Sequence, residues 1–125
     1  MTDLHVALVS VEREIWSGEA TQVNARTTEG EIGILAGHAE LLGQLAEGFT
    51  VTIRRSGGDD ITAAVHGGFL SVTKEGVTIL AERAELSEEI DQSRAQAALE
   101  KARSEDDEAA ALRAESRLRA TGQLV

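Results

Sequence analysis

A hexapeptide near the junction of two compositionally different regions carries the clearest candidate binding residues. It reads Ile90-Asp91-Gln92-Ser93-Arg94-Ala95 and places a carboxylate and a guanidinium three residues apart. Residues three or four apart share one face of a helix, so Asp91 and Arg94 can reach the same ligand. A guanidinium binds phosphate oxygens, and a carboxylate accepts hydrogen bonds from hydroxyl or amino groups. The pair therefore fits a phosphorylated small molecule.

Two arginines further along the chain are candidate complements, because neither has a carboxylate neighbour on its own helix. Arg113 and Arg117 lack Asp or Glu at the positions three or four residues away. They also lie four residues apart, which costs a few tenths of a kcal/mol, about 0.2–0.5, in mutual repulsion. Arg119, by contrast, has Glu115 four residues before it. An anion between Arg113 and Arg117 relieves their repulsion.

Two interpretations of these residues stay open. In the first, Asp91 caps a helix and Arg94 bridges back to it. In the second, Arg94, Arg113 and Arg117 converge on a phosphate group once two helices fold side by side. Asp91 or Glu85 then holds a donor such as a base amino group or a ribose hydroxyl.

The helices that would position these residues are predicted by a change of sequence period after about Glu85. The following stretch is rich in Ala and charged residues and contains no Gly before Gly122. Ser104 to Asp107 separates the two helical segments and has the spacing of a capping box. The two apolar stripes are Ala95, Ala98, Leu99 and Ala102, then Ala110, Ala111, Ala114 and Leu118. We expect a helical hairpin that holds its shape only when docked, because it has few large apolar side chains.

The preceding residues show short β-branched and apolar runs at regular spacing, separated by turn residues. From Leu4 to Leu86 this pattern is typical of an all-β sandwich or barrel with nine or ten strands. One strand is expected from Glu14 to Arg26, with a bulge or corner at Ser17-Gly18. Gly67-Gly68 is expected to bend a strand.

Composition excludes several functional classes. The net charge of −10 argues against a nucleic-acid or anionic-lipid surface, and the absence of Cys excludes disulfides and thiolate sites. No apolar run is long enough to span a membrane, and Met1 leads into an alternating pattern, so we expect a cytoplasmic chain. The histidines have no metal-ligand spacing, and no catalytic triad or acid–base pair is present. The sequence predicts a non-enzymatic protein that binds other proteins.

Several motifs together resemble one known family over essentially the whole chain. They are Gly30-Glu31-Ile32-Gly33-Ile34-Leu35, Gly37-His38-Ala39, Gly67 to Val72, Val77 to Glu82, Ala84-Glu85 and Ile90-Asp91. Their order and spacing resemble the epsilon subunit of F-type ATP synthases. The inter-helix connection, Ser104 to Asp107, is shorter than usual in the family, and the short tail resembles the actinobacterial form.

The resemblance implies a mostly β fold with an α appendage: a ten-stranded β-sandwich, residues 1–86, followed by a two-helix hairpin, residues 87–125. It implies a non-catalytic central-stalk subunit that binds the gamma subunit and the ring of c subunits and helps couple rotation to ATP synthesis. The helices would move between a compact form and an extended form that inhibits ATP hydrolysis. No cofactor is required. The chain would be peripheral on the cytoplasmic face of the bacterial plasma membrane, without inserting into it.

The resemblance also assigns residues. Some members of the family bind regulatory ATP in the compact form through an Ile/Leu-Asp-x-x-Arg-Ala motif. The matching residues are Ile90, Asp91, Arg94 and Ala95, with Glu85 just upstream, and Arg113 and Arg117 in the second helix. Glu31 matches a position that meets the c ring, and His38 is expected to contact the c ring or the gamma subunit.

Two departures from the family and one alternative function complete the sequence-based picture. Ala36 and Glu40 replace the usual prolines beside the Gly-His turn, and Lys101 stands where ATP-binding members often have Arg. The alternative is a free-standing small-molecule binding or isomerase-type β-sandwich with the helices as a lid. That function requires a polar, inward-facing cluster in the β region.

Overall fold

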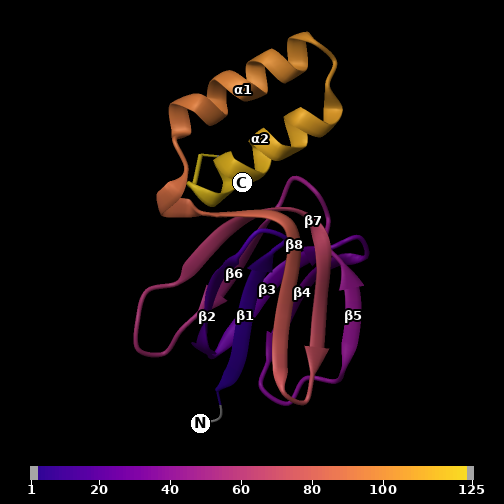
Figure 1. Cartoon of the computed structure of the whole chain (residues 1–125), viewed down its shortest axis with the longest axis vertical. Helices are drawn as coiled ribbons and strands as arrows, with labels where there is room; N and C mark the ends of the chain where they lie inside the picture. The colour runs from indigo at the N-terminus through magenta and orange to yellow at the C-terminus, as the bar shows by residue number, and fades with distance from the viewer. Residues whose placement is uncertain (1–2, 124–125) are drawn as a thin grey trace.

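The computed structural model describes residues 3–123, which form eight strands, a 3-10 turn and two α-helices (Figure 1). The strands are β1 (Leu4–Ser10), β2 (Glu14–Ala20), β3 (Gln22–Thr27), β4 (Gly30–Leu35), β5 (Leu41–Gln44), β6 (Thr50–Arg54), β7 (Ile61–Thr73) and β8 (Gly76–Leu86). The helical elements are η1 (Ser87–Glu89), α1 (Gln92–Ser104) and α2 (Glu108–Ala120). The predicted class, a mostly β fold followed by a helical hairpin, is confirmed. No helix within the described residues is long and apolar enough to span a membrane.

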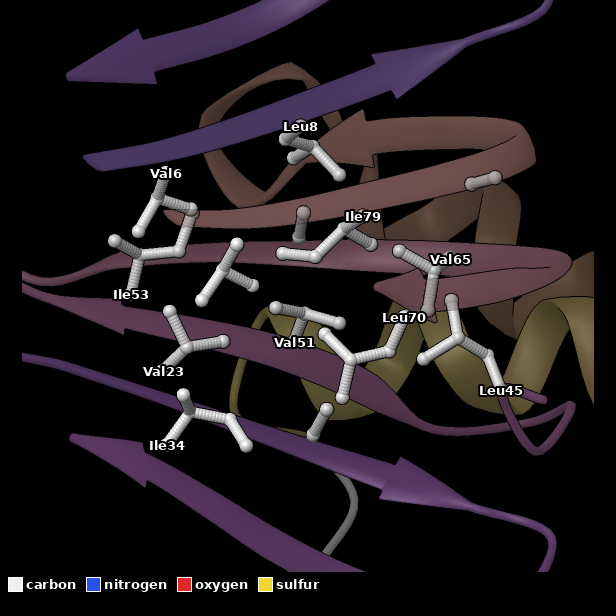
Figure 2. Packing of buried hydrophobic residues seen from close by; sticks show 14 of the residues in the cluster. Val6, Leu8, Val23, Ile34, Leu45, Val51, Ile53, Val65, Leu70 and Ile79 are labelled. Atoms are coloured by element: carbon white, nitrogen blue, oxygen red, sulfur yellow. The ribbon is translucent and has the colours of Figure 1, made fainter. Parts of the chain in front are cut away.

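All the strands belong to one sheet that folds over its own core. The strand order is β2-β1-β8-β7-β6-β3-β4, β5 pairs with β7, and only the β1–β8 pair is parallel. Figure 2 shows Leu8 and Ile79 from one part of the sheet sharing the interior with Val23 and Ile34 from another. These four side chains are no more than 1% exposed. The sandwich core is therefore aliphatic, as the alternating runs predict.

The expected count of ten strands is wrong, because two long strands run where shorter ones were predicted. β7 pairs with β6 along its first half and with β5 along its second half. The bend between the halves lies at Gly67 and Gly68, whose φ angles are 73° and 120°. At Gly68 a Cβ atom would lie 2.0 Å from the carbonyl oxygen of Leu80. The glycines thus let β7 cross from one partner to the other without ending.

The single strand predicted from Glu14 to Arg26 is also wrong. The chain breaks at Thr21, because β2 pairs only with β1 whereas β3 pairs with β4 and β6. Gly18 lies inside β2, where the indole ring of Trp16 comes within 2.9 Å of the position a Cβ would occupy. Gly18 therefore makes room for that ring, and the chain passes to its new strand partners three residues later, at Thr21.

Aspartates begin both helices. Asp91 Oδ1 accepts a hydrogen bond from the backbone N–H of Arg94 at 3.0 Å, which confirms it as the cap of α1. Asp107 caps α2 in the same way. The capping box expected to begin at Ser104 is wrong, since Ser104 is the last residue of α1 and the chain turns at Asp106, whose φ is 54°.

The two helices pack through most of the predicted stripes of small residues, although Ala98 of the first stripe is exposed. The buried cluster between them contains Ala95, Leu99, Ala114 and Leu118, with Ile90 and Ala111 against it. Two leucines are too little apolar surface to hold a hairpin alone. The hairpin lies across one end of the sandwich (Figure 1), where α2 contacts β7 and β6. The position of the hairpin therefore depends on the contacts that α2 makes with the sheet.

The bend of β7 gives a stability prediction. Gly68→Ala should destabilise the fold by about 3 kcal/mol or more, because it places a methyl group against the β8 backbone at a positive φ. Gly57→Ala is the matched control, since open space surrounds that position; its free energy of unfolding should change by less than about 0.5 kcal/mol. Urea unfolding followed by the fluorescence of Trp16 measures both. Equal stability of the two variants would contradict the bend's role.

Candidate functional site

Glu85 lies where α2 meets the sheet, near the end of β8. Its Oε1 accepts one hydrogen bond from Nε of Arg117 at 2.7 Å and another from Nε2 of His66 at 3.1 Å. The side chains of His66, Arg117 and Glu85 are 5%, 26% and 33% exposed. Three elements, β7, β8 and α2, therefore meet at one partly buried carboxylate oxygen. The hydrogen bond to Glu85 requires the His66 tautomer that carries a proton on Nε2.

The partners of Glu85 fix its charge. The hydrogen bond from His66, followed by the hydrogen bond and positive charge of Arg117, lowers the pKa of Glu85 from 4.5 to about 2. Burial acts in the opposite direction but does not prevail. Glu85 is therefore a carboxylate throughout the physiological range, with one guanidinium as its hydrogen-bonded counter-ion.

A second contact between α2 and the sheet involves the loop before β6. Ser116 is fully buried, and its hydroxyl donates to the carbonyl oxygen of Phe49 at 2.6 Å. The guanidinium of Arg119 lies 4.5 Å from the centre of the Phe49 ring and also donates to the carbonyl of Gly48. Arg26 of β3 covers the same ring at 4.8 Å. These backbone hydrogen bonds and cation–π contacts fix the height of α2 above the sheet.

Gly48 makes that close approach possible. Its φ is +88°, a left-handed conformation that side chains rarely adopt. A Cβ atom there would lie only 2.9 Å from Cδ2 of Leu112. Leu112, one of the few large apolar residues of the hairpin, thus sits directly on the glycine.

The remaining predicted ATP-site residues are spread over the hairpin. Asp91 is used as a helix cap, Ile90 packs against the hairpin cluster and Ala95 is buried inside it. Arg94 is exposed on the first turn of α1, and its guanidinium makes no ion pair or hydrogen bond with the described part of the chain. The structure thus brings Glu85 and Arg117 together but shows no contact between either of them and Arg94.

Arg113 faces a surface hollow of about 650 Å³ that His66, Glu82 and Glu47 also line. Its guanidinium has no ion-pair partner among residues 3–123. His66 lines the same hollow, and its buried Nδ1 makes no hydrogen bond with any residue in that range. No group of three or more potential metal ligands occurs among the described residues. The hollow is therefore lined by two arginines without an ion-pair partner among the described residues, Arg83 and Arg113, and by a histidine with one unsatisfied ring nitrogen.

Glu31 and His38 lie at opposite ends of β4. Glu31 is 82% exposed and pairs with Arg26 at 3.5 Å, on the side where Phe49 and the hairpin lie. His38 follows the far end of the strand, where Nδ1 donates to the carbonyl of Ala39 at 2.7 Å. Four strand residues and a two-residue turn separate them, and the strand alone spans roughly 13 Å from Glu31 to Leu35. Two separate contacts, not one, are available to a partner.

An apolar patch on the outer face of the sheet was not predicted from the sequence. Leu42, Phe69 and Leu80 are 73%, 49% and 48% exposed. Phe69 is opposite Leu80 across β7 and β8, and Leu42 of β5 is a diagonal neighbour of Phe69. Val9 of β1 pairs with Leu80 and extends the same face. We call Val9, Leu42, Phe69 and Leu80 the outer apolar patch.

Sequence reasoning missed His66, Phe49 and Ser116. Each has its partner on a distant element: His66 contacts a residue 19 positions away and Ser116 one 67 positions away. Helix spacing can test partners only three or four residues apart. The Gly48-Phe49 pair just before β6 was a local sign of a close backbone approach there.

The lowered pKa of Glu85 predicts a pH window. Because the folded state favours the carboxylate, the added stability is complete above about pH 4.5 and is lost as pH falls toward 2. Allowing for the exposed third of the side chain, we expect about 1–2 kcal/mol. The free energy of unfolding of the wild type minus that of Glu85→Gln, measured in urea from pH 7 to pH 2, should shrink across this window. A constant difference would contradict the assignment.

Comparison with known proteins agrees with the fold and with the resemblance seen in the sequence. Residues 3–87 match the family described as ATP synthase, Delta/Epsilon chain, beta-sandwich domain. The chain is 57% identical over 118 residues to the ATP synthase epsilon chain of Streptomyces coelicolor, covering 94% of each. It is 53% identical over 124 residues to that of Mycobacterium avium, covering 99% of each. The predicted likeness to short actinobacterial forms is therefore confirmed.

Solved structures give the same result. A chain of the Euglena gracilis mitochondrial ATP synthase, in a structure of its OSCP/F1/c-ring part, is similar with a TM-score of 0.75 and 30% identity, over 98% of this chain and 79% of that one. A chain from the central stalk and c-ring structure of the Tetrahymena thermophila enzyme has the same fold, with a TM-score of 0.59 at 17% identity over 77% of this chain and 72% of that one. This chain belongs to the delta/epsilon chain family of ATP synthase subunits.

Proposed function

We propose that this chain is a non-catalytic subunit of the central stalk of a proton-translocating F-type ATP synthase, where it helps couple rotation of the c ring to ATP synthesis. Its curated relatives are epsilon chains over nearly their whole length, and its Euglena neighbour belongs to an F1/c-ring assembly. In this role it is a peripheral subunit on the cytoplasmic face of the membrane, and it binds the gamma subunit and the c ring.

The outer apolar patch is the structural observation that carries the proposal. Phe69, Leu80 and Leu42 lie side by side on one rigid face of the sheet. Contiguous exposed apolar surface of this kind is typical of protein–protein interfaces, whose centres are poor in charge and rich in aromatic residues. We assign the patch to the gamma subunit. Glu31 and His38, at the two ends of β4, are further contact positions toward the c ring or gamma.

The helical hairpin is the regulatory element in this proposal. Its second helix is held by polar contacts at Glu85, Gly48 and Phe49, which can be broken and remade without exposing a large apolar core. An undocked hairpin can extend and inhibit ATP hydrolysis. The proposed regulatory ATP site combines Glu85, Arg113 and Arg117 with the residues of the Ile90 to Ala95 motif. Its arginines Arg94 and Arg113 have no ion-pair partner in the described structure.

The interface predicts a binding defect. A Phe69→Ser, Leu80→Ser double variant should lose affinity for the co-expressed gamma subunit by about 10-fold or more, because it removes two apolar contacts from the centre of the interface. Val11→Ser is the control, since Val11 is 77% exposed but lies outside the patch. Co-purification on tagged gamma measures all three proteins. If the wild type does not co-purify, the proposed function fails; if the double variant binds as tightly as the wild type, the assignment of the patch fails.

The ATP site is tested separately by calorimetric titration of ATP into the isolated full chain. Heat of binding is expected for the wild type, and its loss is expected for Arg94→Ala and for Arg113→Ala. The Glu88→Gln variant, which changes an exposed residue outside the site, should behave as the wild type. No heat for the wild type, or equal heats for all four proteins, would exclude the site.

A further inference from the structure

We propose that Arg83, on strand β8, is a further phosphate-binding residue of the regulatory site, so that the sheet as well as the hairpin contacts the ligand. The inference rests on the ATP site of the proposed function and adds to it a residue that the resemblance to the family does not assign. The part of the ligand that Arg83 would bind is the phosphate chain.

The first support is the position of Arg83, where two surface hollows adjoin. The first hollow, of about 650 Å³, is also lined by Arg113 of α2, and the second, of about 330 Å³, by Arg117. The two hollows share Glu12, Glu82 and Arg83, so Arg83 is the one cationic residue within residues 3–123 that lines both. Arg113 and Arg117 are one helical turn apart on α2. Three guanidiniums therefore line the region where α2 meets β8.

The second support is that these guanidiniums have donors to spare. Arg83 and Arg113 have no ion-pair partner among the described residues. Arg117 donates to Glu85 through Nε at 2.7 Å, which leaves its terminal N–H groups for another acceptor. A guanidinium carries five N–H donors in a planar fork that matches the oxygens of a phosphate group. A phosphate group bound in this region would therefore not have to displace Glu85 from Arg117.

The third support is a buried nitrogen beside Arg83. His66 is the cross-strand partner of Arg83, its side chain is 5% exposed, and it lines the first hollow. Its Nε2 donates to Glu85, whereas its Nδ1 makes no hydrogen bond with the described part of the chain. With the proton on Nε2, the neutral ring presents Nδ1 as an acceptor. A buried acceptor without a partner is unfavourable, so a hydroxyl group of a ligand in this hollow would satisfy it.

Carboxylates in the same region limit its net charge. Glu12, Glu47 and Glu82 line the hollows and are exposed. They offset the arginines, so a general attraction for anions is weak here. Binding of a phosphate group then depends on charge-assisted hydrogen bonds from correctly placed guanidiniums. Loss of the guanidinium of Arg83 should therefore weaken binding more than loss of a positive charge elsewhere on the surface.

Lys101 is the matched residue for that comparison. It stands where ATP-binding members of the family often have Arg, yet its side chain is 77% exposed and its Nζ lies 4.0 Å from Glu105 in the last turn of α1. Lys101 lines neither of the hollows that Arg83 lines. In this chain the additional cation of the site is therefore assigned to β8 and not to α1.

The test is calorimetric titration of ATP into the isolated full chain and two variants. Arg83→Gln should bind ATP about 10-fold or more weakly than the wild type, because it removes charge-assisted hydrogen bonds to the phosphate chain. Lys101→Gln should bind within about 2-fold of the wild type, because its charge is exposed and outside the hollows. The side chain of Arg83 is exposed, so its loss should leave the urea midpoint of unfolding unchanged, which shows that the variant is folded.

Direct contact is tested by NMR of the ¹⁵N-labelled full chain. The Nε–H signal of Arg83, identified by its absence from Arg83→Gln, should shift when the wild type is saturated with ATP. An unshifted signal, wild-type affinity in Arg83→Gln, or a greater loss in Lys101→Gln than in Arg83→Gln would overturn the role of Arg83 while leaving the ATP site in place. No binding by the wild type would overturn both. Neither result depends on gamma, so both are distinguishable from failure of the stalk function, which co-purification measures.

Discussion

One partly buried carboxylate connects the two parts of this molecule. Glu85 lies near the end of the long strand β8 and accepts hydrogen bonds from His66 on the neighbouring strand and from Arg117 on α2. The pair stabilises a hairpin whose own core contains only two leucines among its fully buried side chains. Because hydrogen bonds to charged groups contribute more than neutral ones, a single pair can decide whether so small an element stays docked. The same pair is reversible, since both groups are readily solvated when they separate.

The sheet is suited to a different task. Its core is continuous and aliphatic. The bend of β7 lets the two long strands, β7 and β8, contribute to both layers of the sandwich. Such a body transmits force without changing shape. The outer apolar patch lies on the sheet, whereas the Glu85–Arg117 ion pair lies at its junction with the hairpin. The proposed interface with gamma and the contact that holds the hairpin thus lie on separate surfaces of the chain.

Local rules predicted the elements better than they predicted the contacts between them. The period of the apolar stripes and the cap at Asp91 are local properties, and both agree with the structure. The bend at Gly67-Gly68 was predicted and is confirmed, but the strand count was wrong because local residue types do not show that the two sides of the bend remain one strand. Glu85 and Arg117 were candidate site residues, but helix spacing cannot show that a residue 32 positions away is the partner. His66 gave no local signal, since its role comes from strand pairing.

The distance between α2 and the sheet tests the central claim most directly. The chain contains no cysteine, so two introduced cysteines, at the exposed residues Ser56 in the β6–β7 loop and Gln123 just beyond α2, can carry spin labels without competing sites. Pulsed dipolar spectroscopy without nucleotide should give one narrow distance distribution, and Glu85→Gln should broaden it toward longer distances. A broad distribution in the protein that retains Glu85, or the same narrow one after Glu85→Gln, would contradict a hairpin held by its ion pair to the sheet.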